Sequence, residues 1–266
     1  MAEAGSILIC GCGNMGGAML AGWLGAGLDP ARFTVVDPVL AAAPPGVRLL
    51  REFPVERFDC VLLGIKPQLL ADVAPLLAPA TRGAVLISIL AGAELDSLAA
   101  QLPGAAAWIR VMPNLAAAIG KSPLGLFAKG LGAAGRAQVE ALLAPLGTAE
   151  WLASESQLDA VTALAGSGPA FVYRFIAALA QGGAALGLDP AQADRLARAT
   201  VEGAAMLAAA SAETPAELAR RVTSPGGTTA AGLAVMDAGE AFAGIVEATL
   251  RAARDRGSEL AAAARG

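Results

Sequence analysis

The chain has 266 residues, of which 56% are hydrophobic and 16% are charged, so it can form one large domain or two of ordinary size. Its formal net charge is -4 and it has no basic tract, which argues against a nucleic-acid partner. Histidine is absent, which excludes mechanisms that need an imidazole base or a histidine metal ligand.

The cysteines and the N-terminal stretch indicate a cytoplasmic protein. Cys10, Cys12 and Cys60 show no metal-binding spacing, and we expect Cys10 and Cys60 in buried strands, without disulfides, in a reducing compartment. Residues 4–28 carry no charge, a length that could span a membrane. Glycines interrupt this stretch and no basic n-region precedes it, so we expect neither a membrane span nor a signal peptide.

The first predicted strand, residues 6–10, runs directly into Gly11-Cys-Gly-Asn-Met-Gly16, and a helical pattern follows over 18–24. This is GxGxxG between a strand and a helix, the context that gives the motif its meaning. Gly11 makes the turn, Gly13 lets the backbone approach a pyrophosphate, and Gly16 lets helix and strand pack closely. The segment predicts dinucleotide binding.

The second predicted strand, residues 32–36, ends at Asp37. An acid at this point usually accepts hydrogen bonds from the adenosine ribose hydroxyls and repels a 2′-phosphate. Asp37 therefore favours use of NADH at least as well as NADPH. Asp37-Pro38 is also a good turn start, so a plain turn residue is the alternative.

Further strands are predicted at 47–50, 60–65, 84–89 and 107–111, with 124–128 as another candidate and a helix over 136–146. Lys66-Pro67-Gln68 and Met112-Pro113-Asn114 follow two of these strands. They lie at carboxyl ends, where parallel sheets bind ligands. Strands alternating with helices predict a doubly wound α/β domain over residues 1–152.

After Trp151 the pattern becomes helical, with helices predicted at 166–187, 189–210, 228–238 and 240–264. Their alanine-rich faces are apolar almost all round, which suits helices buried on several sides. We expect an all-α domain over residues 153–266 that packs against another subunit. A compact bundle within one chain is the alternative.

A turn that opens a helix is predicted at Val222-Thr-Ser-Pro-Gly-Gly-Thr-Thr229. Gly226 and Gly227 allow close backbone approach, and the free N–H groups of a helix start can bind a carboxylate. Thr228 and Thr229 add hydroxyls, one of which can cap the helix while the other faces a ligand. An ordinary glycine-rich helix entry is the alternative.

With these pieces in place, the chain resembles the pyrroline-5-carboxylate reductase family over nearly its whole length. Five motifs occur in the family's order: GCGNMG at 11–16, GIKPQ at 64–68, VMPN at 111–114, ALAGSGPAF at 163–171 and VTSPGGTT at 222–229. The first is shared with many dehydrogenases, whereas the last two together are specific. The resemblance implies an N-terminal Rossmann domain, an all-α dimerisation domain, and NAD(P)H-dependent reduction of 1-pyrroline-5-carboxylate to L-proline, the last step of proline biosynthesis. It also implies homodimers or decamers built from dimers.

The resemblance further implies roles for individual residues, and no metal. Lys66 would lie beside the nicotinamide, with positioning favoured over proton donation, and Thr229 would contact the imine or amine nitrogen; these two are the catalytic candidates. The implied cofactor-binding residues are Gly11, Gly13, Asn14, Met15, Gly16, Asp37, Lys66, Pro67 and Asn114. The implied substrate-binding residues are Ser224, Gly226, Gly227, Thr228 and Thr229. Of these, Ser224, Gly227 and Thr228 would bind the carboxylate, largely through backbone N–H groups.

The sequence departs from the family at two places. Leu115-Ala116 follow the MPN motif where Thr-Pro is usual, which bears on the shape of that loop. Asp37 stands at or near the place where many members carry a residue suited to a 2′-phosphate. Cofactor preference, dimer versus decamer, and inhibition by proline stay open.

Two other functions compete with this interpretation. A β-hydroxyacid dehydrogenase would need a lysine on the helix after a Gly-Ser-x-Gly turn. The segment after Gly166-Ser167 offers no lysine, only Arg174. A protein that binds NAD(P) without turnover would not need the intact SPGGTT segment.

Overall fold

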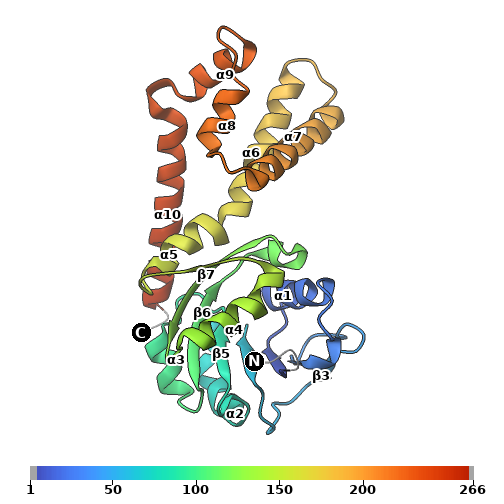
Figure 1. The fold of residues 1–266 in the computed structure, drawn as a ribbon, viewed down its shortest axis with the longest axis vertical. Helices are drawn as coiled ribbons and strands as arrows, with labels where there is room; N and C mark the ends of the chain where they lie inside the picture. Colours follow the sequence, from blue (N-terminus) through green and yellow to red (C-terminus); the bar gives the residue numbers. More distant parts are fainter. Residues whose placement is uncertain (1–4, 264–266) are drawn as a thin grey trace. The chain divides into compact units, whose positions relative to one another are not determined.

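The structure, a computed structural model, describes residues 5–263. These fall into two compact units (Figure 1). Gly168–Ala252 form a helical unit, and the remaining described residues form a unit built on a β-sheet. The predicted domain boundary between residues 152 and 153 stays a prediction.

The sheet unit contains one eight-stranded sheet in the order β3-β2-β1-β4-β5-β6-β7-β8. Strands β1 to β6 are parallel, β7 is antiparallel to β6, and β8 is parallel to β7. The order reverses between β1 and β4, and the crevice at such a point is where doubly wound sheets bind ligands. The strands are β1 (Ile7–Cys10), β2 (Phe33–Val36), β3 (Arg48–Leu50), β4 (Cys60–Leu63), β5 (Val85–Ser88), β6 (Ala107–Met112), β7 (Ser122–Lys129) and β8 (Gly147–Trp151).

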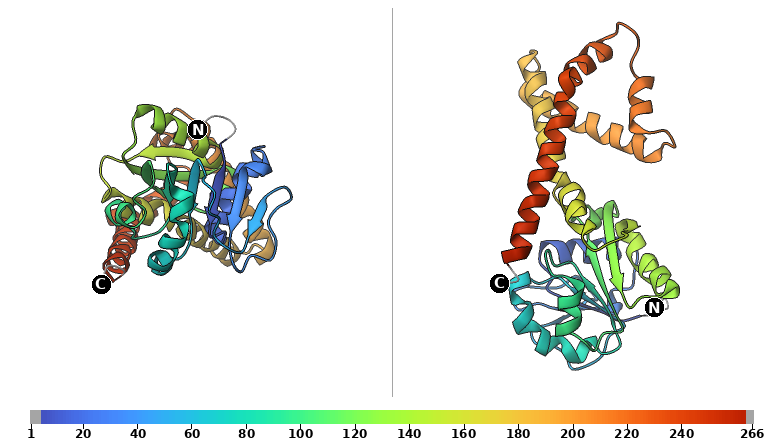
Figure 2. Two further views of the ribbon diagram at one scale, coloured as in Figure 1. Left: turned by 90° about the horizontal axis from the view of Figure 1, so that it is seen from below. Right: turned by 90° about the vertical axis from the view of Figure 1, so that its left-hand side faces the viewer.

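Helices cover both faces of the sheet (Figure 2). The helices α1 (Asn14–Gly25) and α4 (Ala133–Leu143) contribute to one hydrophobic cluster, whereas α2 (Leu70–Thr81) and α3 (Leu95–Gln101) contribute to the cluster on the other face. Trp23 of α1 stacks on Phe33 with ring centroids 5.5 Å apart, and its Nε1 donates to the carbonyl of Leu142 at 2.7 Å. This one side chain ties α1 to both β2 and α4.

The predicted strands are confirmed, including the candidate at 124–128, and the predicted helix at 136–146 is α4 followed by a 3-10 turn, Ala144–Leu146. Cys10 and Cys60 lie buried in strands as expected, and the three thiols are free. The elements that were not predicted include β8, the helix α3, the short helix α5 (Gln157–Val161) with its π-helical continuation Thr162–Gly166, and α8 (Pro215–Arg221).

The helical unit contains α6 (Gly168–Ala185), α7 (Pro190–Ala210), α8, α9 (Thr228–Met236) and the first part of α10 (Ala241–Ala263). The helices α6 and α7 pack against each other (Figure 1). Gly187, with φ +102°, lies in the connection between them. The Asp189 carboxylate caps α7 by accepting from the Gln192 amide at 3.0 Å.

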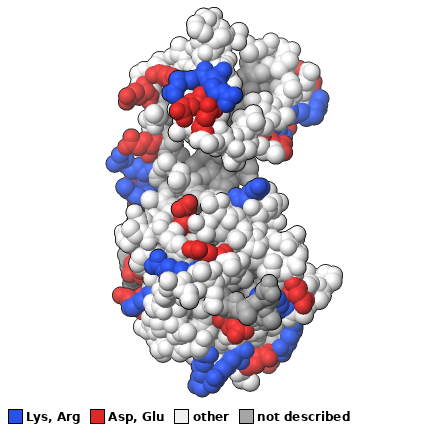
Figure 3. Space-filling model, in the orientation of Figure 1, with Lys and Arg blue, Asp and Glu red and all other residues white. Residues whose placement is uncertain are grey.

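This unit buries almost nothing within one chain: of its described residues, Ala193 and Ala197 are the buried ones. By length and composition, the helical run Gln157–Ala185 could cross a membrane, and α9 together with Ala238–Glu259 passes the same test as a bent pair. Charged side chains on the face in view form small groups of mixed sign (Figure 3). The large apolar residues exposed on this unit include Tyr173, Phe175, Leu207, Val222, Val235, Phe242 and Ile245. A surface of this kind marks an interaction site.

Candidate active site

The glycine-rich loop connects β1 to α1 in a conformation that requires glycine at two positions. Gly11 has φ +86°, and a Cβ there would lie 2.9 Å from the carbonyl oxygen of Gly64. A Cβ at Gly16 would lie 2.5 Å from the carbonyl oxygen of Gly11. Since real Cβ atoms do not approach backbone so closely, any side chain at these positions would separate the helix from the strands.

The start of α1 is open to a ligand. Gly13 is the N-cap residue, no side chain caps the helix, and its first turn holds no acid. A Cβ added at Gly13 would meet no atom within 4 Å. The first helical hydrogen bond runs from Gly17 to Gly13, so the amides of Asn14, Met15 and Gly16 have no partner within the helix. Free donors at a helix start and an unobstructed approach suit the pyrophosphate of a dinucleotide.

Asp37 follows β2 and is 7% exposed. Its Oδ2 accepts from the Cys12 amide at 2.9 Å, and its Oδ1 accepts from the amides of Val39 and Leu40 at 2.9 and 3.0 Å. Burial raises the pKa of Asp37, but these three amides and the charge of Arg51 outweigh it, so the net pKa is lowered. The carboxylate therefore stays ionised and joins the turn after β2 to the glycine-rich loop.

The buried thiols have no nucleophilic role here. Burial raises the pKa of Cys10 and of Cys60 to about 12. It also raises the pKa of Cys12, with the Asp37 charge adding to the effect. All three thiols are protonated near neutral pH, and a protonated thiol is a poor nucleophile.

Lys66 and Pro67 lie just beyond the carboxyl end of β4. Lys66 is exposed and precedes the 3-10 turn Pro67–Leu69. Beside this turn lies a cavity of about 490 Å³ whose far wall comes from the loop after β5, including Gly92 and Ala93. Sequence reasoning missed this loop, although its place after the neighbouring parallel strand could have indicated it.

Asn114, after β6, is buried and uses both ends of its side-chain amide. Oδ1 accepts from the Ala116 amide at 2.9 Å, and Nδ2 donates to the carbonyl of Ala165 at 2.9 Å. Proline at position 116, as is usual in the family, would have no N–H to give Oδ1. Ala165 belongs to the π-helical turn Thr162–Gly166, so Asn114 anchors that turn. The predicted contact of Asn114 with the cofactor stays a prediction.

A partly buried ion pair near this edge was also missed. Arg110 of β6 donates to Glu155 at 2.8 Å, and the same carboxylate oxygen accepts from the Leu95 amide at the start of α3 at 2.8 Å. Glu155 thus links β6 and α3 to the segment after β8. A basic residue inside an apolar strand is the sequence signal that could have indicated a buried partner.

Within the helical unit, the predicted substrate segment forms a tight turn before α9. Gly226 has φ +71°, and the Gly227 amide donates to the carbonyl of Ser224 at 3.0 Å. A Cβ at Gly227 would lie 2.4 Å from Ser224 Oγ, so glycine lets the serine side chain fold against the backbone. This is a turn that places proline second and glycine third.

The start of α9 is open in the same sense as that of α1. Gly227 is the N-cap residue, so the expectation that a threonine hydroxyl caps this helix is wrong. The first helical hydrogen bond runs from Ala231 to Gly227, which leaves the amides of Thr228 and Thr229 without a helical partner. Both threonines are exposed, and their hydroxyls make no hydrogen bond among the described residues.

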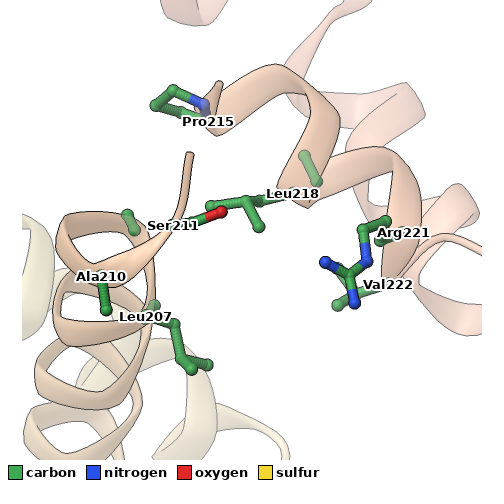
Figure 4. A pocket seen from close by; sticks show the side chains of 10 residues that line it. Leu207, Ala210, Ser211, Pro215, Leu218, Arg221 and Val222 are labelled. Carbon is green, nitrogen blue, oxygen red and sulfur yellow. The ribbon is translucent and has the colours of Figure 1, made fainter. Parts of the chain in front are cut away.

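The same helical unit holds a cavity of about 700 Å³ between the end of α7 and α8 (Figure 4). Leu207, Leu218 and Val222 line it together with Arg221, and the Arg221 guanidinium pairs with Glu213 at 2.5 Å. The cavity is largely apolar, and the chain segment that lines it ends at Val222, shortly before the Ser224–Thr229 turn.

The sequence-predicted residues therefore fall into two sets, one in each unit. The glycine-rich loop, Asp37, Lys66-Pro67 and Asn114 follow the carboxyl ends of β1, β2, β4 and β6 in one sheet. The second set, Ser224 and residues 226–229, lies within the helical unit. Among the described residues, no group of His, Cys, Asp and Glu could hold a metal ion.

A doubly wound sheet with an open glycine-rich turn before α1 defines the Rossmann class of dinucleotide-binding proteins. Two family models match the chain: pyrroline-5-carboxylate reductase dimerisation over residues 155–260, and coenzyme F420-dependent NADP oxidoreductase over residues 6–92. The pyrroline-5-carboxylate reductase of Pseudomonas aeruginosa is 38% identical over 96% of each chain. That of Glycine max is 39% identical over 77% of this chain and 75% of its own.

The chain belongs to the pyrroline-5-carboxylate reductase family, as its motifs predict. The solved structure of the reductase from Coxiella burnetii is similar with a TM-score of 0.87 at 28% identity, covering 97% of this chain and 98% of that one. The enzyme from Streptococcus pyogenes gives a TM-score of 0.78 at 28% identity, covering 97% and 100%. The predicted fold class, a Rossmann domain followed by a helical dimerisation domain, is confirmed. The β-hydroxyacid dehydrogenase alternative is not favoured.

Proposed function

We propose that the protein catalyses the NAD(P)H-dependent reduction of 1-pyrroline-5-carboxylate to L-proline, the last step of proline biosynthesis. The observation that carries this proposal is the 38% identity over 96% of both chains to a pyrroline-5-carboxylate reductase. The intact SPGGTT residues at the start of an uncapped helix support it, because they supply the donors that a small carboxylate substrate needs.

The sheet unit fits the cofactor. The amides of Asn14, Met15 and Gly16 would hold the pyrophosphate at the open start of α1. When bound, the reduced nicotinamide supplies the hydride. Lys66 and Pro67, beyond the end of β4, would position the nicotinamide end in the crevice at the carboxyl edge of the sheet.

The helical unit supplies the substrate site in this proposal. A protonated cyclic imine accepts hydride readily, so the protein needs mainly to hold and orient it. Ser224 and the free amides of Thr228 and Thr229 would bind the carboxylate, and the Gly227 amide, predicted from the resemblance to bind it as well, donates within the turn instead. The Thr229 hydroxyl would face the ring nitrogen, because a hydroxyl both donates and accepts and can serve imine and amine in turn.

We further propose that the protein works as a homodimer in the cytoplasm, without a membrane or nucleic-acid partner. The match of residues 155–260 to a dimerisation family supports this, as does the apolar surface that one chain leaves exposed on α6, α7, α9 and α10. A measurement of molecular mass in solution would distinguish a dimer from the larger assembly, a decamer built from dimers.

The direct test is a spectrophotometric assay of the purified protein with NADPH and, separately, NADH. Adding 1-pyrroline-5-carboxylate should oxidise the cofactor and yield L-proline in equal amount, identified by mass spectrometry. A β-hydroxyacid with the oxidised cofactor serves as the control for the rival activity. Absence of proline with both cofactors would contradict the proposal.

A further inference from the structure

The acid after β2 is directed into the protein. In many dinucleotide-binding folds this acid meets the ribose hydroxyls, but here three backbone amides already bind the Asp37 carboxylate. The residue as a whole is 7% exposed. Asp37 therefore shapes the loop and presents little of its carboxylate to a ligand.

The turn that follows carries no polar side chain. Residues 38–46 are Pro-Val-Leu-Ala-Ala-Ala-Pro-Pro-Gly, so this segment cannot distinguish a ribose 2′-hydroxyl from a 2′-phosphate through its side chains. Any side-chain recognition at this corner of the sheet must come from a neighbouring element.

Arg51 is that neighbour. It directly follows β3, whose last residue, Leu50, pairs with Val36 of β2. The Arg51 guanidinium donates from Nη1 to the carbonyl of Asp37 at 2.8 Å and from Nη2 to the carbonyl of Ala41 at 3.4 Å. It therefore lies across the turn after β2.

The guanidinium has capacity for an anion. Arginine has five N–H donors, and these two hydrogen bonds leave three of them. Arg51 is exposed and makes no ion pair among the described residues, whereas nearby Arg48 pairs with Glu56. A planar guanidinium with free donors suits the oxygens of a phosphate.

We propose that Arg51 recognises the adenosine 2′-phosphate of NADPH, that Asp37 is a positioning residue for the loop beneath it, and that the protein therefore prefers NADPH to NADH. This reverses the preference that Asp37 favours from the sequence alone. The inference rests on cofactor binding by the proposed function, but not on the identity of the imine substrate.

The test measures binding of two cofactor fragments by calorimetry, without substrate or turnover. The wild type should bind 2′,5′-ADP more tightly than 5′-ADP, which lacks the 2′-phosphate. Arg51→Gln should weaken 2′,5′-ADP binding roughly tenfold to a hundredfold, the effect of one or two charge-assisted hydrogen bonds, and leave 5′-ADP binding unchanged. Arg82→Gln is the matched control, because Arg82 is exposed and lies between α2 and β5, on the side of the sheet where the parallel strands begin, away from their carboxyl ends.

The outcomes separate the inference from the proposed function. Equal losses for both fragments in Arg51→Gln, or tighter binding of 5′-ADP by the wild type, would overturn the role of Arg51. Fragment binding as expected but without proline formation would leave that role standing and remove the proposed reaction instead. Kinetics with intact cofactors add a second readout: Arg51→Gln should raise the KM for NADPH while kcat stays near that of the wild type.

Discussion

The sharpest test of the substrate site is Thr229→Val, which removes one hydroxyl and keeps the shape of the side chain. In the structure this hydroxyl has no hydrogen bond among the described residues and does not cap α9. Valine and threonine are both β-branched and have similar helix propensities. The free energy of unfolding should therefore change by less than about 0.5 kcal/mol, the range of ordinary surface substitutions.

Catalysis should respond quite differently. If the hydroxyl holds the ring nitrogen, its loss removes one positioned hydrogen bond, worth about 1.5–3 kcal/mol when one partner is charged. This corresponds to a fall in kcat of roughly ten- to a hundredfold, with unchanged cofactor affinity. Steady-state kinetics and thermal unfolding of the same preparation measure the two effects together.

Thr228→Val provides the matched control, because Thr228 is also exposed and would act through its backbone amide. Its kcat should fall much less than that of Thr229→Val, while Thr229→Ser should recover much of the rate. The reasoning fails if Thr229→Val keeps its turnover and loses only thermal stability, since the hydroxyl would then be structural.

Four further expectations follow from the geometry. Lys66→Met should raise the cofactor KM more than it lowers kcat; the opposite pattern would indicate a chemical role. Gly16→Ala would place a Cβ 2.5 Å from a backbone oxygen. It should lower the unfolding free energy by about 1–3 kcal/mol and weaken cofactor binding. Gly17→Ala is the control, because its Cβ would lie 3.7 Å from the nearest atom, the Cys12 carbonyl oxygen, and it should have neither effect. Because the pKa of Asp37 is lowered, its charge stabilises the fold fully at pH values above the usual pKa of an aspartate, and this stabilisation is lost as the pH falls through the lowered pKa. The difference in melting temperature between the wild type and Asp37→Asn should therefore become smaller in acid. A difference that stays constant with pH would refute this. Light scattering should show at least a dimer at micromolar concentration, and a stable monomer would contradict the assembly.

Sequence patterns predicted the sheet well because its parallel strands are buried on both faces and appear as apolar runs. Strand β8 was missed, since residues 147–151 alternate between exposed and half-buried positions. Helix α8 could have been found: Thr214, Pro215 and Glu217 form the signature of a capping box, which the structure shows in full. The π-helical turn Thr162–Gly166 has no comparable signal, because its anchor Asn114 is distant in sequence.

The residues of the candidate site were likewise predictable only in part. Local chemistry was predictable at Gly11 and Gly16, where close backbone approach demands glycine. The direction of the Asp37 carboxylate was not, because it depends on the Cys12 amide, which folding brings from another strand. Arg51 escaped notice for the same reason: it reaches the turn after β2 only because β3 pairs beside it.

The small number of buried residues in the helical unit bears on how stable this chain is against degradation in the cell. With Ala193 and Ala197 as its buried residues, this unit leaves most of its apolar surface to be covered by association, so its stability should follow mass action. Its melting temperature should rise with protein concentration. A newly synthesised chain would stay vulnerable to proteases until it meets a second copy, so the rate of synthesis itself would determine how much of this protein persists.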